Sequence, residues 1–435
     1  MELNLTSYEQ DMLEGKHGRI KQIAMEKICR YANVLGATEL CTVTMATLYC
    51  GAHNYLEVLG SDDVVETFSV MSMGAEKDLR LDQFSSVCQC QSCVEPFDNL
   101  RCRELQISTA LKEKNERYMQ YFLDAGVMRV TTCAPYLTGW VPVRGQHFVT
   151  SESSNVLLCN SLFGACGNPD GIEAGFWAAA CGRIPKWGKH DPANRLGTCL
   201  VKINIPIESS FDWDLLGYTI GKTVPSGSVP VLEGEFILPN MLKFKQLAAS
   251  LAVVSDVDMC HIVGLTPEAA TCEMAFGGKE PQAVYQINED DMDRCRRMLC
   301  NDTPGKVKYI SLGCPHYSLA EIKEVVDYLG QRKFAKGIVF QIWTAYSIRE
   351  LANRCGYTKI IQEAGGDIYA GHCPFGVFEN EKSKKKILDG AEGVAFDAAK
   401  MASGLPANYD AGIKTYYGSK YQCIDAAVNG YWEVK

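Results

Sequence analysis

The sequence predicts an α/β fold made of several packed units with largely parallel sheets. Two observations support this class. Stretches with helical periodicity, such as residues 17–36 and 115–126, alternate with short β-rich runs. The length of 435 residues exceeds what a single core usually buries, and a content of 47% hydrophobic and 22% charged residues is that of an ordinary globular protein.

The elements follow one another in an order that suits such a fold. Thr6 and Glu9 have the spacing of a capping box, which predicts a helix at the N-terminus. The β-rich runs that follow lie at residues 127–133, 198–207, 307–312, 336–343 and 367–373. Proline and glycine cluster at 224–234, so we expect two units, an N-terminal one over residues 1–228 and a C-terminal one over 229–435.

Composition and charge exclude some classes of function. The net charge of −9 argues against a nucleic-acid partner, because phosphate binding needs a cationic face. The longest apolar run, around residues 249–254, is far shorter than the roughly 20 residues of a membrane span. No signal peptide is visible, so we expect a cytosolic protein, in which the 20 cysteines act as small hydrophobes, metal ligands or nucleophiles.

Three cysteines share one local design. Cys133, Cys314 and Cys373 each stand where a β-rich run ends, with a proline one or two residues later. The carboxyl ends of strands are where sites form in open α/β sheets, and the proline keeps the thiol out of the sheet ladder. Three ligands would leave a metal or an iron–sulfur cluster one open position for a substrate. The alternative is that they are buried small residues.

The surroundings of Cys314 sharpen this hypothesis. Ser318 and Glu321 form a second capping-box pattern, so Cys314 precedes a helix N-terminus, which favours a thiolate. His316 and His372 each lie next to a candidate ligand and are either acids, ligands, orienting donors or packed histidines.

A second cysteine cluster competes with the first. Cys88, Cys90 and Cys93 are closely spaced, with Cys102 nearby, and a structural zinc site is one reading. The cluster lacks paired C-x-x-C knuckles, and nothing around it has the pattern of a strand end. Buried or surface cysteines are therefore the other reading.

Two segments carry candidate substrate contacts. Ser151, Glu152, Ser153 and Ser154 precede an apolar segment with helical spacing, where hydroxyls and free amides bind a carboxylate or simply cap the helix. The segment GYTIGKT at 217–223 is one residue too short for a phosphate loop, so it predicts at most a glycine turn that places Lys222 near a site.

Several blocks together resemble the large subunit of aconitase X. They are TTCAPYLTGWVPVRGQHFVTSESSN, GRIPKWGKHDPANR, DLLGYTIGKT, GCPHYSLAEIKEV and AGHC, in that order. The resemblance spans nearly the whole chain and implies an aconitase-like α/β fold. It also implies an iron–sulfur cluster or a single iron held by the three cysteines that match the family pattern, Cys133, Cys314 and Cys373.

The resemblance further implies a hydro-lyase of small hydroxy acids, notably cis-3-hydroxy-L-proline in bacteria and phosphomevalonate in archaea. It implies a separate small swivelling subunit that supplies the catalytic base. On this reading the candidate catalytic residues are His316, as proton donor to the leaving hydroxyl, with Ser318 and Glu152. Substrate contacts would come from Ser151, Ser153, Ser154, Lys222, Ser419 and Lys420.

The chain departs from the family pattern at two places. Cys166 stands in GACGNPDGIEAG where the family usually has an arginine, and YGSK replaces the usual N-S-G-K near the C-terminus. Because both places are expected to contact substrate, the reaction class is better supported than the substrate. We expect cis-3-hydroxy-L-proline, with phosphomevalonate or a non-catalytic iron–sulfur or zinc scaffold as alternatives.

Overall fold

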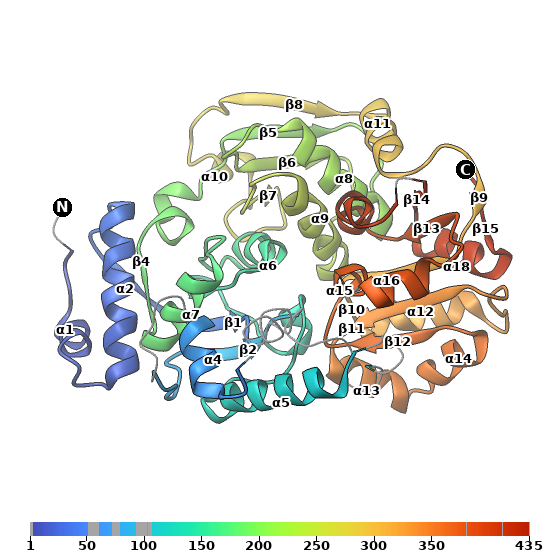
Figure 1. Ribbon diagram of the computed structural model, residues 1–435. Helices are drawn as coiled ribbons and strands as arrows, with labels where there is room; N and C mark the ends of the chain where they lie inside the picture. Colours follow the sequence, from blue (N-terminus) through green and yellow to red (C-terminus); the bar gives the residue numbers. More distant parts are fainter. Residues whose placement is uncertain are drawn as a thin grey trace.

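The computed structural model describes residues 3–50, 61–71, 79–92, 102, 107–379, 381–410 and 412–434. Three groups of elements, each with its own sheet, form three lobes that meet near the centre of the molecule (Figure 1). The predicted α/β class with largely parallel sheets is confirmed.

The first lobe has a four-stranded sheet in the order β2-β1-β3, with β4 also paired to β1. Strands β2 and β3 run parallel to β1, and β4 runs antiparallel to it. The strands are β1 (Leu40–Leu48), β2 (Val87–Cys90), β3 (His147–Val149) and β4 (Arg183–Pro185). The helices are α1 (Ser7–Leu13), α2 (Arg19–Leu35), α4 (Val64–Met71), α5 (Thr109–Asp124), α6 (Ser153–Leu158) and α7 (Ile172–Cys181). The predicted capping box of Thr6 and Glu9 opens α1.

The second lobe is a four-stranded parallel sheet in the order β7-β6-β5-β8. Its elements are β5 (Cys199–Ile203), α8 (Ser210–Thr223), β6 (Pro230–Gly234), α9 (Met241–Val254), β7 (His261–Ile262), α10 (Cys272–Ala275), β8 (Ala283–Ile287) and α11 (Glu289–Leu299). The division predicted after residue 228 runs through this sheet, because β5 precedes it and pairs with β6, which follows it.

The segment GYTIGKT is not the glycine turn that the sequence suggested, because it lies inside α8. Its glycines allow α8 to pack closely on α9. A Cβ atom at Gly217 would lie 2.4 Å from the carbonyl oxygen of Leu247, and one at Gly221 would lie 2.6 Å from Cγ2 of Val254. The glycines therefore serve helix packing.

The third lobe is a five-stranded parallel sheet in the order β12-β11-β10-β13-β14, with every residue of the central strand β10 buried. Its strands are β10 (Tyr309–Tyr317), β11 (Val339–Thr344), β12 (Asp367–Ala370), β13 (Gly393–Phe396) and β14 (Lys414–Tyr417). Its helices are α12 (Leu319–Leu329), α13 (Tyr346–Arg354), α14 (Tyr357–Ala364), α15 (Pro374–Glu379), α16 (Glu381–Leu388), α17 (Ala399–Gly404) and α18 (Lys420–Asn429). A short antiparallel pair joins β9 (Gly305–Lys306) to β15 (Tyr431–Trp432).

The strand predicted over residues 127–133 does not form. Met128 makes an isolated bridge with Gln89 of β2, but the pairing stops there. The reason lies in the backbone, because Thr131 has a φ of 52°, a left-handed conformation that no strand tolerates. The segment thus turns away from the sheet just before Cys133.

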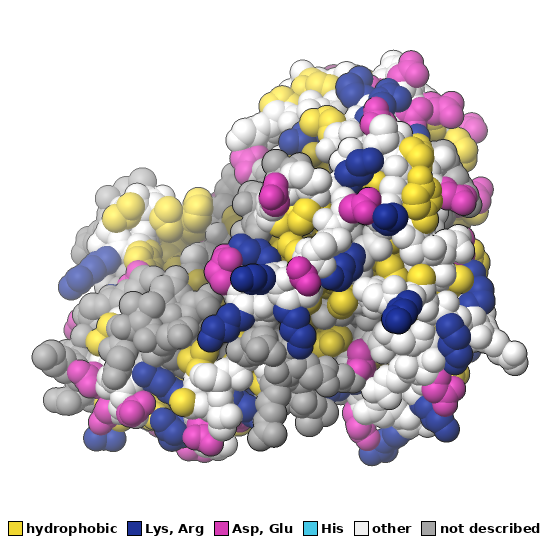
Figure 2. Space-filling view, turned by 45° about the vertical axis from the view of Figure 1, so that its right-hand side comes forward, with side chains coloured by type: hydrophobic (Ala, Val, Ile, Leu, Met, Phe, Trp, Pro, Cys, Tyr) yellow, Lys and Arg dark blue, Asp and Glu magenta, His cyan; other side chains and the backbone are white. Residues whose placement is uncertain are grey.

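The surface carries positive and negative side chains interspersed over the face seen in Figure 2. None of the helices in the described parts of the chain combines the length and the apolar character needed to cross a membrane.

Candidate active site

Cys314 lies in an irregular part of the central strand β10. The pairing of β10 with β11 shifts between Leu312 and Tyr317, so the intervening residues leave the ladder. Gly313 has a φ of 96°, and a Cβ atom there would lie 2.4 Å from the carbonyl oxygen of Trp343. Only glycine allows β10 and β11 to approach so closely at this turn. The prediction that Cys314 leaves the sheet ladder is confirmed, although the strand itself continues to Tyr317.

The other two cysteines arrive from different elements. Cys373 lies between β12 and the first residue of α15, Pro374, as the sequence predicted. Cys133 follows the left-handed Thr131 and precedes the 3₁₀ turn Pro135–Thr138. A buried residue held in a strained backbone conformation is common at functional sites, and Thr131 is fully buried.

His316 joins the segments that carry all three cysteines. Its Nε2 lies 2.7 Å from the carbonyl oxygen of His372, the neighbour of Cys373, and its Nδ1 lies 2.9 Å from the hydroxyl of Thr132, the neighbour of Cys133. The backbone N–H of His316 also donates to Sγ of Cys133 at 3.3 Å. One residue, two positions after Cys314, therefore links the three candidate ligand segments.

These contacts fix the tautomer of His316. The carbonyl of His372 only accepts, so Nε2 carries the proton, and Nδ1 accepts from the hydroxyl of Thr132. Burial lowers the pKa of His316 to about 4, so the ring is neutral near pH 7. The Nε2–H of His316 therefore donates to the carbonyl oxygen of His372 and not to a bound molecule. The role of His316 as proton donor to the leaving hydroxyl stays a prediction.

The three thiols lie near enough to affect one another's ionisation. Burial raises the pKa of Cys133 to about 12, with further contributions from Glu152 and Cys373. Burial likewise raises the pKa of Cys314 well above its usual range, with contributions from Cys133 and Cys373. Together with the hydrogen bonds of His316, this shows that the segments carrying the three cysteines lie beside one another.

Glu152 and Lys400 form an ion pair beside these thiols. Oε1 of Glu152 accepts from Nζ of Lys400 at 2.7 Å, and the side chains are 14% and 21% exposed. Burial lowers the pKa of Lys400, but Glu152, Cys314 and Cys133 outweigh it and hold this pKa well above the usual range. A charged ammonium group therefore stands next to the cysteines. No motif around Lys400 in the sequence signals this role.

The serines of the 151–154 segment are partly engaged. Ser151 donates to Oε1 of Gln91 at 2.7 Å, and Ser154 donates to Oε1 of Glu152 at 3.1 Å. Neither Ser151 nor Ser153 caps α6, because Glu152 is the N-cap residue and makes no side-chain cap. Both polar atoms of the neighbouring Asn155 are buried and have no hydrogen-bond partner within the described residues. The segment therefore offers uncommitted polar groups close to Glu152.

Ser318 is the N-cap of α12 in the predicted capping box with Glu321. Its hydroxyl donates to Glu321 at 2.9 Å. Glu321 also accepts from Nζ of the fully buried Lys245, which donates in addition to the carbonyl oxygens of Pro315 and His316. Lys245 of α9, which the sequence analysis did not identify, thus satisfies the backbone where β10 leaves the ladder.

Three predicted contact residues lie elsewhere. Lys222 is exposed near the C-terminal end of α8, with its ammonium 5.4 Å from the ring centroid of Tyr218. Ser419 caps α18, and Lys420 pairs with Glu324 at 2.5 Å. These last two line a cavity that Tyr317, at the end of β10, also borders.

Two residues of the second cysteine cluster lie in a strand. Cys88 and Cys90 are buried in β2, contrary to the expectation that no strand end is nearby, while Cys93 lies outside the described residues. The thiol of Cys50, just after β1, donates to the carbonyl oxygen of Leu48 at 3.4 Å, and burial raises its pKa well above the usual range, with a contribution from Cys90. Cys88 and Cys90 pack in the core of the first lobe, which fits the reading of buried structural cysteines.

The donor chemistry at the first cluster fits a thiophilic metal such as iron. Cys133 and Cys314 are buried and Cys373 is half-buried, the sulfur of Cys133 accepts a backbone N–H, and the ammonium of Lys400 influences the first two thiols. In the described parts of the chain, however, no group of three or more His, Cys, Asp or Glu side chains is arranged as a formed metal site. The candidate ligands are thus supported by their chemistry and proximity, without preformed coordination geometry.

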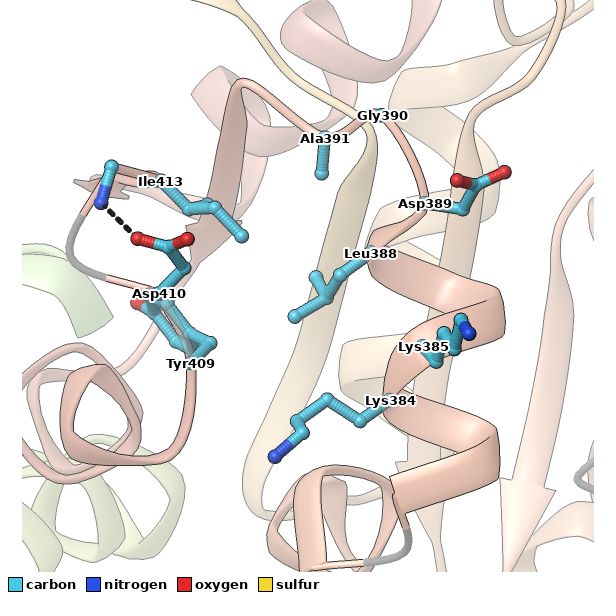
Figure 3. A pocket seen from close by; sticks show the side chains of 10 residues that line it. Lys384, Lys385, Leu388, Asp389, Gly390, Ala391, Tyr409, Asp410 and Ile413 are labelled. Carbon is cyan, nitrogen blue, oxygen red and sulfur yellow. Dashed lines mark hydrogen bonds between the residues drawn. The ribbon is translucent and has the colours of Figure 1, made fainter.

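A larger hollow of about 770 Å³ lies on the surface between α16 and a segment that contributes Tyr409, Asp410, Gly412 and Ile413 (Figure 3). Lys384 and Lys385 of the basic helix border it, and Asp410 accepts from the backbone N–H of Gly412. Its described lining contains no histidine or cysteine. This hollow therefore lacks the groups that the first cluster offers for chemistry.

Comparison with family models matches nearly the whole chain. Residues 2–193 match the aconitase X first domain, residues 197–297 the second domain and residues 307–429 the third domain. The three matched segments correspond to the three lobes of the structure.

Curated relatives agree with these matches. The chain is 29% identical to the phosphomevalonate dehydratase large subunit of Methanocaldococcus jannaschii, over 85% of this chain and 88% of that protein. It is 28% identical to the cis-3-hydroxy-L-proline dehydratase of Hypocrea jecorina, over 100% of this chain and 70% of that protein.

A solved structure has the same fold. The holo-form of Thermococcus kodakaraensis aconitase X superposes with a TM-score of 0.76 at 24% identity, covering 98% of this chain and 100% of that one. The family models give the family, and the curated relatives, which are named dehydratases, give the reaction class. The chain belongs to the aconitase X family and is a hydro-lyase.

Proposed function

We propose that this chain removes water from a small hydroxy acid, as the large subunit of a two-subunit enzyme with an iron-containing centre. The observation that carries the proposal is the contact set of His316. Through Thr132, His372 and Sγ of Cys133, this residue holds together the segments of the three candidate iron ligands, Cys133, Cys314 and Cys373.

When bound, the iron would supply a Lewis acid that stabilises the departing hydroxide. The residues of the chain supply the setting for this chemistry. Cys133 and Cys314 are buried within the hydrophobic core, and this low-polarity setting strengthens electrostatic interactions with the substrate. The neutral ring of His316 keeps the segments in register through hydrogen bonds at both nitrogens.

The ion pair of Glu152 and Lys400 is the proposed contact for the substrate carboxylate. The ammonium of Lys400 lies beside the thiols and is held by Glu152, so it offers positive charge where negative charge develops after proton loss. The hydroxyl of Ser153 and the amide of Asn155 are proposed donors to the same group, while Ser151 and Ser154 donate to Gln91 and Glu152 and so position these side chains. Glu152 then acts mainly by orienting Lys400.

The preferred substrate is cis-3-hydroxy-L-proline. The dehydratase of Hypocrea jecorina that bears this name matches the entire length of the chain. Phosphomevalonate is the second candidate, because the Methanocaldococcus jannaschii relative is named for it. A phosphorylated substrate favours an arginine for bidentate binding, and Cys166 occupies the place where the family usually has one.

A small subunit is the proposed partner. The relative from Methanocaldococcus jannaschii is named a large subunit, and the dehydratase of Hypocrea jecorina extends beyond the part that this chain matches. We expect the partner to supply the base that removes the proton next to the substrate carboxylate.

The deciding experiment measures iron, sulfide and the visible spectrum of protein purified anaerobically together with its partner. The parent is compared with Cys133→Ser, Cys314→Ser and Cys373→Ser, and Cys423→Ser serves as the control because Cys423 is buried elsewhere in the third lobe. We expect iron in the parent and the control and its loss in the three variants. The rate of dehydration of cis-3-hydroxy-L-proline, measured by mass spectrometry as the loss of one water, should be proportional to the iron content of each protein.

The opposite outcome has a defined meaning. Iron or zinc that survives all three substitutions but is lost in Cys88→Ser or Cys90→Ser would favour a scaffold with a metal in the first lobe. A parent that binds no iron and dehydrates no hydroxy acid would refute the proposed function.

A further inference from the structure

The buried carboxyl group of Asp214 in α8 links two lobes. Its Oδ1 accepts from the hydroxyl of Ser250 in α9 at 2.6 Å, which holds it within the second lobe. Its Oδ2 accepts from the backbone N–H of Ala399 and from the hydroxyl of Tyr417, both in the third lobe, each at 2.7 Å. A carboxyl group at this depth costs free energy unless hydrogen bonds compensate for its lost hydration. Asp214 therefore fixes the third lobe against the second at this point.

The bond to Ala399 matters because α17 has no cap of its own. Ala399 is the first residue of this helix, and the N-cap residue Ala398 makes no side-chain cap. The first N–H groups of a helix have no partner inside it, and a side-chain oxygen usually accepts from one of them. With six residues, α17 is also too short to be stable by itself. The oxygen of Asp214 thus supplies from another lobe what an N-cap side chain would supply.

The next residue of α17 is Lys400, the cation beside the cysteines. Its Nζ donates to Oε1 of Glu152 at 2.7 Å, and its charge interacts with the thiols of Cys133 and Cys314. A lysine side chain has a flexible four-carbon stem, so the position of its ammonium group depends on where its backbone is held. Asp214 holds this backbone one residue before Lys400, while Glu152 holds the ammonium end.

We propose that Asp214 is a positioning residue for the reaction, which holds the start of α17 so that the ammonium of Lys400 meets the carboxylate of the substrate. The inference rests on the proposed function, in which Lys400 binds this carboxylate. Asp214 acts only through α17, because its oxygens are taken up by protein donors. A displacement of about 1 Å at a binding group can cost on the order of a hundredfold in rate, so a hold of this kind is significant for catalysis.

Two substitutions separate the hydrogen bonds of Asp214 from its shape. Asp214→Asn keeps an oxygen for Ala399 and Tyr417, and its amide can donate to Ser250. The hydroxyl of Ser250 can then donate to the carbonyl oxygen of Gln246, which already lies 2.7 Å away. Asp214→Leu has a similar size but accepts no hydrogen bond, so it releases α17.

Thr219→Val is the matched control. Thr219 is a buried residue of the same helix, and its hydroxyl donates to the carbonyl oxygen of Leu215 within α8. Thermal unfolding shows which variants fold. If Asp214→Leu does not fold, Asp214→Ser replaces it, because the serine side chain is too short to reach the N–H of Ala399.

Hydrogen–deuterium exchange, followed by mass spectrometry, measures the hold on α17 without requiring activity or iron. We expect exchange over residues 398–404 to become about tenfold faster or more in Asp214→Leu and to stay at the parent rate in Asp214→Asn and Thr219→Val. Exchange over residues 420–429 should not change in any variant. The proposal is overturned if Asp214→Leu leaves exchange over 398–404 at the parent rate, or if exchange rises equally over 420–429.

Kinetics with cis-3-hydroxy-L-proline, on enzyme purified anaerobically with its partner, measure the effect on the reaction. We expect kcat/KM to fall about tenfold or more in Asp214→Leu at unchanged iron content, with parent-like values for Asp214→Asn and Thr219→Val. In a Lys400→Met background, Asp214→Leu should have little further effect, because the group that it positions is gone. Equal losses in both backgrounds, or in Asp214→Asn as in Asp214→Leu, would overturn the positioning role. A parent that dehydrates no hydroxy acid would refute the proposed function and with it the use of Lys400, whereas the exchange result would still decide whether Asp214 holds α17.

Discussion

The Nε2–H of His316 donates to the carbonyl oxygen of His372 over a distance of 2.7 Å, which joins the end of β10 to the turn after β12. Because the other ring nitrogen accepts from Thr132, the same imidazole also reaches the first lobe. Replacement by His316→Ala leaves both partners buried and unpaired, and we expect a loss of about 2–4 kcal/mol in the free energy of unfolding. Denaturant titration measures this, and Thr132→Val, which removes only one contact, should lose less. If His316→Ala lost no more free energy of unfolding than Thr132→Val, the linking role of His316 would be contradicted.

The ion pair of Glu152 and Lys400 gives a second prediction. Glu152→Gln leaves a mostly buried ammonium without its partner, so stability should fall by about 3 kcal/mol. The double variant with Lys400→Met should lose less than the sum of the single losses, because no uncompensated charge remains. The exposed pair of Lys323 and Asp327 provides the control, and Asp327→Asn should change stability by no more than about 0.5 kcal/mol. Additive losses at Glu152 and Lys400 would show that the pair is not coupled.

The stability of the protein should depend on pH through Asp214. This fully buried carboxyl accepts from Ser250, Tyr417 and the backbone of Ala399, yet burial raises its pKa to about 7. The folded state thus keeps the proton that the unfolded state releases near pH 4. The stabilising contribution is complete below about pH 4 and is lost as the pH rises to about 7, on the order of 1–3 kcal/mol.

Unfolding titrations at pH 4.5, 6 and 7.5 measure this slope in the parent and in Asp214→Asn. The variant has no titrating group at this position, so its slope should be smaller over that interval. Asp293→Asn, on the exposed side of α11, is the control and should keep the slope of the parent. A parent whose stability rises steadily across this interval would show that other groups outweigh Asp214.

The close packing of α8 on α9 predicts an unusual response to alanine. Alanine normally stabilises a helix interior by up to about 1 kcal/mol relative to glycine. At Gly217 the added Cβ would lie 2.4 Å from the backbone of Leu247, so Gly217→Ala should instead destabilise by about 1–3 kcal/mol. Gly175→Ala in α7 is a matched control, because nothing lies within 4 Å of its added Cβ. Differential scanning calorimetry should therefore give melting-temperature shifts of opposite sign.

Much of the third lobe could be predicted from the sequence. The alternation of β-rich runs and helical stretches gave the parallel sheet, and the spacing of Ser318 and Glu321 gave the start of α12. The local pattern around Cys373, a β-rich run followed by proline, also matches the turn between β12 and α15. These features depend on neighbours within a few residues, which is why a sequence carries them.

The contacts that complete the site could not be predicted in this way. Lys400 meets Glu152 across 248 positions of sequence, and Lys245 meets Glu321 across 76. No local pattern distinguishes these lysines from solvated ones. The strand predicted before Cys133 failed for a different reason, because its β-branched residues favour a strand while Thr131 adopts a left-handed backbone conformation.

The departure of β10 from its ladder has a consequence for dissecting this protein. The backbone groups released there are taken up by other lobes, since the N–H of His316 reaches Cys133 and the carbonyls of Pro315 and His316 reach Lys245 of α9. An excised third lobe would present these groups to solvent with neither partner. Fragments cut between the three lobes should accordingly behave as interdependent pieces that regain their structure only when mixed.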